Sequence, residues 1–152
     1  MSSRQQTPPL SEQLEILNRL KVDSVRGWGS MRPEEMLRHC SDFIRFTLGE
    51  KKASQSTRLI GKLFGWLIYA YVIRKNPWNF PKNMQTFPEI KQRPGRTLDF
   101  NTEKATLAAA ILRAIQLENK VHHPIYGQLS ADKARQLVQL HTAYHLRQFS
   151  LF

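Results

Sequence analysis

Two histidines near the end of the chain, His141 and His145, have the spacing of metal ligands on a helix. They are four residues apart, so a helix places both imidazoles on one face, one turn from each other. The same face carries Ala134, Leu137 and Val138, so both rings are expected to point inward. Burying two neutral imidazoles without partners costs on the order of 1–3 kcal/mol for each unsatisfied polar group. A divalent cation that accepts a lone pair from each ring removes this cost.

A third ligand has to come from another helix, and His39 is the candidate. It borders an apolar stripe formed by Met36, Cys40, Phe43 and Thr47, and a helical bundle can bring it opposite the last helix. The terminal pair lacks the glutamate of an H-E-x-x-H motif. The missing glutamate excludes a zincin peptidase. A purely structural role for the three histidines stays open, because such pairs also arise by chance and core histidines often hydrogen-bond to the backbone.

Three further residues are considered for a role near this site. Glu35 lies one turn before His39 on the same face, where it can ligate, act as a base, or simply be a solvated residue of the first helical turn. Cys40 projects about 100° away from His39 around the helix, so it is expected to be core. His123, which precedes Pro124, can line the mouth of the bundle or cap a helix.

The elements that have to position these residues are predicted to be helical throughout. Apolar residues recur at helical spacing in five segments, and no convincing strand alternation is present, so the predicted fold class is all-α. The segments begin after Pro9, at Pro33, at Ser54, at a cap formed by Asn101 or Thr102, and after Ser130 as a cap.

Two segments are harder to place. The connection from Lys75 to Asn101 contains four prolines, which disfavour a helix, and its three aromatic residues suggest that it folds down onto the bundle. The longest apolar stretch, Leu63 to Ile73, is too short to cross the roughly 30 Å hydrocarbon layer of a membrane. We expect it to be a buried core helix, with a contribution to an interface as the alternative.

Composition narrows the cellular context. A single cysteine excludes an intramolecular disulfide, and the polar first nine residues lack the apolar core of a secretory signal, so a cytoplasmic protein with no membrane partner is expected. The net charge is +11, and the stretch from Arg45 to Arg96 holds eleven Lys or Arg residues against Glu50 and Glu89. Such a surface favours nucleic acid or anionic membranes. The charges are spread out, so a solvated surface is the preferred interpretation.

The order of three motifs adds a family resemblance. The stretches WGSMRPEEMLRHC, HHPIYGQLS and HTAYHLRQF resemble the DinB-like (DinB/YfiT) superfamily, in a bacterial branch of unknown function, from about Leu14 to Phe149. The length suits one domain over residues 1–152, with residues 1–9 expected as a flexible tail. The resemblance implies a four-helix bundle with a long crossover connection. It also implies a homodimer, and a divalent metal, commonly nickel or zinc, held by His39, His141 and His145.

The chain departs from that pattern at two positions. Tyr144 stands where the branch often has a further histidine, so Tyr144 joins Glu35 and His123 as a residue of the surrounding pocket rather than a ligand. Arg32 stands where a capping serine or threonine is expected before Pro33.

An open three-histidine site predicts a metal-dependent enzyme in which the cation lowers the pKa of a water molecule or a substrate thiol. By resemblance the activity is that of a hydrolase or a thiol-dependent transferase acting on a small molecule. The alternative is a non-catalytic protein that binds nucleic acid or another acidic partner through its basic surface.

Overall fold

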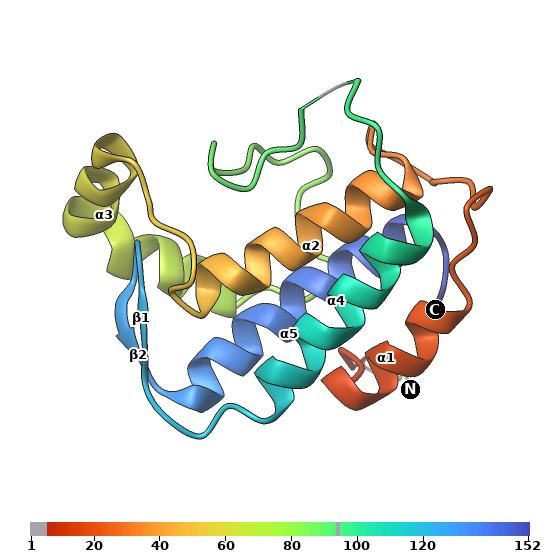
Figure 1. Cartoon of the computed structure of the whole chain (residues 1–152). Coiled ribbons are helices and arrows are strands. Elements are labelled where there is room, and N and C mark those ends of the chain that lie inside the picture. Colours follow the sequence, from red (N-terminus) through yellow and green to blue (C-terminus); the bar gives the residue numbers. More distant parts are fainter. Residues whose placement is uncertain (1–5, 94) are drawn as a thin grey trace.

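The computed structural model describes residues 6–93 and 95–152 and contains five helices and one small antiparallel sheet (Figure 1). The fold is therefore mostly helical, but the all-α expectation missed a β-hairpin within the stretch HHPIYGQLS, in which Val121 pairs with Leu129. Strands of three residues are too short to produce a visible alternation in the sequence. The elements are α1 (Leu10–Asn18), α2 (Pro33–Thr47), α3 (Gln55–Ile73), α4 (Phe100–Ile115), β1 (Val121–His123), β2 (Gly127–Leu129) and α5 (Ala131–Gln148).

The helix starts follow local capping chemistry. Pro33 is the first residue of α2, as predicted, and Ser130 caps α5 by accepting a hydrogen bond from the amide of Lys133. The prediction for α4 was wrong by two residues, because Asp99 is the cap and its carboxylate accepts from the amide of Thr102 at 2.8 Å. The sequence prediction chose Asn101 or Thr102 as the cap and did not consider Asp99, which precedes Phe100.

Four helices share one apolar core. α2 packs against both α4 and α5, and α1 packs across α4 and α5. The buried core residues come from all four helices and the segments that follow two of them: Leu10, Ile16, Leu17, Leu20, Met36, Leu37, Cys40, Ile44, Leu107, Ala110, Ile111, Ala114, Val138, Leu146 and Phe149. This core fixes the α2 and α5 surfaces that carry the histidines.

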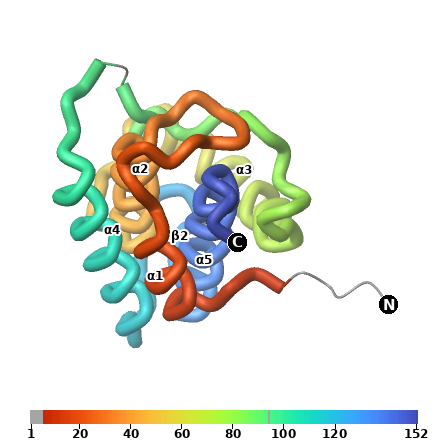
Figure 2. The backbone as a smooth tube through the Cα atoms, turned by 90° about the vertical axis from the view of Figure 1, so that its right-hand side faces the viewer, coloured from red at the N-terminus to blue at the C-terminus, as the bar shows by residue number. Residues whose placement is uncertain are grey.

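α3 lies outside this core, on the side of the molecule opposite α4 (Figure 2). The expectation that Leu63 to Ile73 is buried was wrong. The buried residues of α3 are the small ones, Thr57, Gly61 and Gly65. Seven large apolar side chains are at least 44% exposed and form what we call the outer face of α3: Leu59, Ile60, Leu63, Phe64, Trp66, Leu67 and Tyr71.

The β-hairpin determines which face of α3 turns inward. A Cβ atom on Gly61 would lie 2.7 Å from the Cα of Ile125, and one on Gly65 would overlap the carbonyl oxygen of Ile125. The hairpin turn therefore approaches the α3 backbone so closely that only glycine fits. Apolarity alone predicted burial, whereas the small residues marked the packed face. No helix in residues 6–93 and 95–152 has the length and apolar character required to span a membrane.

The connection between α3 and α4 has no helix or strand in its described residues, as its prolines predicted. It does fold onto the molecule: Ile90 is buried, and Phe87 stacks near Phe46 with 6.3 Å between ring centroids. The carbonyl of Glu89 also accepts a hydrogen bond from Lys51 at 2.8 Å. Such contacts bring this long connection against α2.

The predicted flexible tail covers residues 1–9, of which residues 1–5 lie outside the described part of the chain. The carbonyl oxygens of Thr7 and Pro8 both accept hydrogen bonds from the Gln139 side chain at 3.1 Å. Pro8 is buried. The described end of this segment is therefore held against α5.

Candidate metal centre

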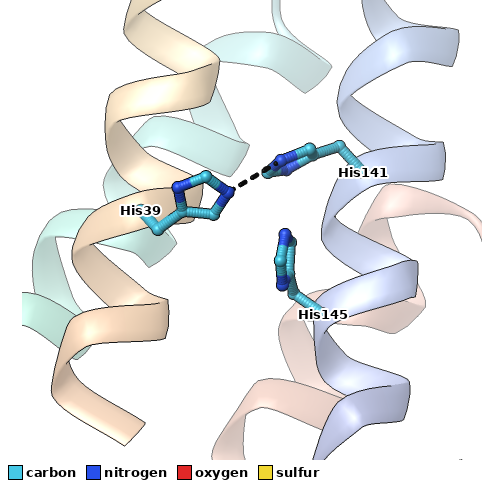
Figure 3. Close-up of side chains that lie close together, drawn as sticks. All are labelled: His39, His141 and His145. Carbon is cyan, nitrogen blue, oxygen red and sulfur yellow. Dashed lines mark hydrogen bonds between the residues drawn. The ribbon is translucent and has the colours of Figure 1, made fainter. Parts of the chain in front are cut away.

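The structure brings His39, His141 and His145 together between α2 and α5 (Figure 3). Each ring contributes one nitrogen to a group whose members all lie within 4.8 Å of one another. The closest pair is Nε2 of His39 and Nε2 of His141, at 3.1 Å. Within the described part of the chain, this group contains histidines and no carboxylate or thiol.

Hydrogen bonds on the outer sides of two rings set their orientation. Nδ1 of His39 lies 2.9 Å from the carbonyl oxygen of Ile90, and Nδ1 of His145 lies 2.7 Å from Oε1 of Gln148. Both partners are acceptors, so each Nδ1 carries the proton and donates it. In the neutral rings the lone pairs are then on Nε2, on the sides that face the cluster. Outer hydrogen bonds of this kind are typical of histidines that ligate metals.

His141 is held by stacking and by one hydrogen bond within the cluster, between its Nε2 and Nε2 of His39 (Figure 3). Its ring lies parallel to that of Phe43, with an interplanar angle of 1° and 3.6 Å between centroids. Its Nδ1 is buried without a hydrogen-bond partner. His39 and His145 are buried, and the His141 residue is partly exposed although its Nδ1 is not.

Burial keeps all three imidazoles neutral near pH 7. Desolvation lowers the pKa of His39, and it lowers the pKa of His141 well below its usual range, with the other two rings adding to the effect on His141. The pKa of His145 falls to about 3, mainly through desolvation and further through His39. Neutral imidazole is the form that binds metal ions.

The residues present fit a divalent ion. Two nitrogens that bind one tetrahedral zinc ion at about 2.0–2.1 Å lie about 3.3–3.4 Å apart. The 3.1 Å separation of His39 and His141 is close to that distance, and the widest separation in the group, 4.8 Å at most, has to shorten by up to about 1.4 Å on binding. Without a cation, the Nε2 lone pairs of His39 and His145 both face the cluster. Only His141 then has a ring proton left to donate to them.

Gln148 connects the cluster to the loop before α2. Its Oε1 accepts from His145, and its Nε2 donates to the carbonyl of Trp28 at 3.2 Å. Gly29 has a φ of 83°, and a Cβ at this position would overlap the Gln148 amide. The left-handed backbone favours glycine there, and a larger residue would displace the Gln148 amide from its place beside Trp28.

Tyr144 lies beside the cluster, as a pocket residue would. Its ring packs edge-on against His145 with 5.0 Å between centroids, and against Trp28 at 6.1 Å. Its hydroxyl donates to the carbonyl of Pro81 at 3.1 Å. Tyr144 therefore ties the α3–α4 connection to α5, the helix that carries His141 and His145.

Glu35 and His123 are placed elsewhere. The Glu35 carboxylate accepts from the Arg32 amide at 2.8 Å, which supplies the cap that Arg32 itself lacks. Nδ1 of His123 accepts from the amides of Ile125 and Tyr126, at 3.1 and 3.2 Å, within the hairpin turn. Neither residue belongs to the histidine group.

Cys40 belongs to the core, as expected. It is fully buried, and desolvation raises the pKa of its thiol, which leaves it protonated and unreactive.

Glu35 also lines a cavity of about 400 Å³ at the start of α2, together with Arg32 and Arg96. That cavity includes none of the three histidines.

Three residues that orient the rings were not found from the sequence. Gln148 is three residues after His145 on one helix, so its position on the same face was a usable signal. Phe43 follows His39 by four residues and was assigned only to the core stripe. The Ile90 carbonyl had no sequence signal, because any residue of an irregular segment can present its backbone oxygen.

Comparison with known proteins gives one family. The family described as "Protein of unknown function (DUF1569)" matches residues 4–151, which is nearly the whole chain. No curated protein and no solved structure matches.

Proposed function

The chain belongs to the DUF1569 family of proteins of unknown function, and we propose that it binds one divalent metal ion through His39, His141 and His145. The observation that carries this proposal is the convergence of three buried neutral imidazoles within 4.8 Å, two of them with Nδ1 committed to acceptors outside the cluster. In a purely structural cluster each buried ring nitrogen would have a polar partner outside the group. Here Nε2 of His39 and Nε2 of His141 are paired only with each other, and Nδ1 of His141 has no partner.

The proposed metal is zinc or nickel. Three imidazoles also accept copper or iron, since affinity for nitrogen ligands is high across the later divalent ions of the first row. The absence of a carboxylate in the described cluster disfavours magnesium and calcium, which prefer oxygen ligands.

We further propose an enzymatic role, either as a hydrolase or as a thiol-dependent transferase. A divalent cation held by three protein ligands keeps open coordination positions, where it can activate a water molecule or a thiol by lowering its pKa. Three neutral ligands leave the full positive charge of the ion in the site, which favours an anionic nucleophile. A small substrate would approach from the side of His141, the one residue of the three that is partly exposed.

The chain's own residues position this chemistry. Gln148 and the Ile90 carbonyl hold the Nδ1 protons of two rings, and Phe43 holds the third ring by stacking. Tyr144, whose ring packs on His145, would form one wall of the substrate site.

The arrangement also supports a relationship with the DinB/YfiT type of four-helix bundle. Four helices share the core, and a long irregular connection separates α3 from α4. The three histidines that the resemblance names as ligands lie together between α2 and α5. We propose this relationship on those grounds.

The direct test is the metal content of purified protein. Elemental analysis of the native chain is expected to give one zinc or nickel ion per chain, and the triple variant His39→Ala/His141→Ala/His145→Ala is expected to give none. A native protein that neither carries nor takes up either metal at micromolar concentration would exclude the proposed function. Equal metal content in the triple variant would exclude this set of ligands.

A further inference from the structure

The outer face of α3 is a continuous, exposed apolar surface. Its seven residues are at least 44% exposed, and Trp66 reaches 70%. At about 100° per residue they cover one continuous side of the helix, opposite the small residues that pack on the hairpin. An exposed apolar patch of this size marks an interaction surface.

The helix cannot turn this face inward. Gly61 and Gly65 contact the hairpin backbone so closely that no larger residue fits on that side. A rotation of α3 would drive Leu63 or Trp66 into the space that these glycines occupy. The apolar face is therefore directed outward by the packing of the fold itself.

The segment that contains α3 carries charge of a single sign. Residues 51–76 contain six Lys or Arg residues and no Asp or Glu. The nearest carboxylates in the sequence already have partners: Glu50 pairs with Arg45 and Arg113, and Glu89 accepts from the Ser54 amide. An occupant of the face has to supply both an apolar layer and negative charge.

A basic cavity adjoins the same face. It has a volume of about 410 Å³ and is lined by Arg58, Lys62 and His122 beside the apolar Leu59 and Pro124. Leu59 belongs to both the cavity and the outer face. A group that is anionic at one end and apolar at the other would contact both.

We propose that the outer face of α3 binds the surface of an anionic lipid membrane, with α3 lying in the interfacial plane. Leucine, phenylalanine and tryptophan side chains would enter the boundary between headgroups and acyl chains, and the basic residues would contact lipid phosphates. Arg58 and Lys62 on α3, and the exposed Lys52 just before it, supply those contacts. This interaction is peripheral, in accord with the short length of the apolar segment.

The charge pattern favours lipid over the two other occupants. A second copy of this chain would bring the same basic residues near their counterparts, with no carboxylate on either α3 to pair with them. Nucleic acid would neutralise the charge but would leave the seven apolar side chains against a polar phosphate backbone. Anionic lipid satisfies both features.

Vesicle flotation tests the proposal with the full chain. The protein is expected to float with phosphatidylcholine vesicles that contain phosphatidylserine, and to float far less with phosphatidylcholine alone. The variant Leu63→Glu/Trp66→Glu is expected to abolish flotation. The matched variant Val25→Glu/Leu112→Glu makes the same charge change at two exposed apolar residues away from α3, and it should float like the native protein.

The basic residues provide a second comparison. Lys62→Gln is expected to weaken vesicle binding by roughly fivefold, whereas Lys21→Gln, at an exposed lysine near the end of α1, should change it little. Failure to float with either vesicle would overturn the proposal, and so would equal binding to both. Sedimentation that shows a dimer separated by Leu63→Glu/Trp66→Glu would also overturn it, because a second copy would then cover the face. None of these results depends on metal binding.

Discussion

Oε1 of Gln148 lies 2.7 Å from Nδ1 of His145, one turn earlier on α5, and the other atom of the same amide donates to the carbonyl of Trp28. One side chain therefore fixes the tautomer of a ring in the histidine cluster and docks the loop that leads into α2. Because the acceptor and the donor of Gln148 have different partners, a substitution can remove the contact with His145 or the contact with Trp28 separately.

Replacement of Gln148 by leucine is expected to lower metal affinity by about 10- to 100-fold, because His145 loses the acceptor that orients it. Gln148→Glu keeps an acceptor for His145 but removes the donor to Trp28. It should therefore retain most of the metal affinity while losing thermal stability. Calorimetric titration with zinc and thermal unfolding measure the two effects. Equal affinity in the leucine variant would show that Gln148 does not orient the ligand.

The close packing of α3 on the hairpin predicts an unusual response to alanine. In an exposed helix, Gly→Ala stabilises by about 1 kcal/mol. Gly65→Ala should instead destabilise by roughly 1–3 kcal/mol, because its Cβ would overlap the backbone of Ile125, which cannot move as a flexible side chain would. Urea unfolding measures the change, with Ser56→Ala at an exposed α3 position as the control. A stabilised Gly65→Ala protein would refute this packing.

Metal-free protein is expected to lose stability as the pH falls below about 6.5. The pKa values of His145 and His123 are lowered to about 3 by burial, whereas the unfolded chain has the ordinary value of about 6.5. Between these values the unfolded state binds more protons, so each histidine lowers the free energy of unfolding by up to about 1.4 kcal/mol per pH unit. The contribution is fully present above pH 6.5.

Urea unfolding at several pH values from 7 to 5 checks this expectation, because ordinary carboxyl groups stay largely ionised in that range. His123→Asn can still accept from the hairpin amides but does not titrate there. This variant should therefore reduce the dependence of the free energy of unfolding on pH by about the contribution of one histidine. A free energy of unfolding that is independent of pH in this range would contradict the neutral, buried state of these rings.

The sequence was sufficient for the parts of the site that depend on helical geometry. His141 and His145 share a face because they are four residues apart on α5, and Pro33 and Ser130 marked the starts of the two helices that carry the ligands. Gln148 could have been predicted by the same reasoning.

Other features depend on tertiary contacts that no local pattern contains. The Ile90 carbonyl reaches His39 only because an irregular connection folds back over α2. The apolar residues of α3 predicted burial, yet a hairpin of two three-residue strands occupies the other side of the helix and leaves them outside. In both cases the deciding contact joins segments that are far apart in the sequence.

Calorimetric titration of zinc and of nickel into metal-free protein at neutral pH tests the central claim most directly. We predict one ion per chain, and affinities at least about 100-fold weaker for His39→Ala, His141→Ala and His145→Ala taken singly. His122→Ala, which removes an exposed histidine outside the group, should bind like the native protein. A native chain that binds neither ion, or three variants that bind as tightly as the native chain, would contradict the claim.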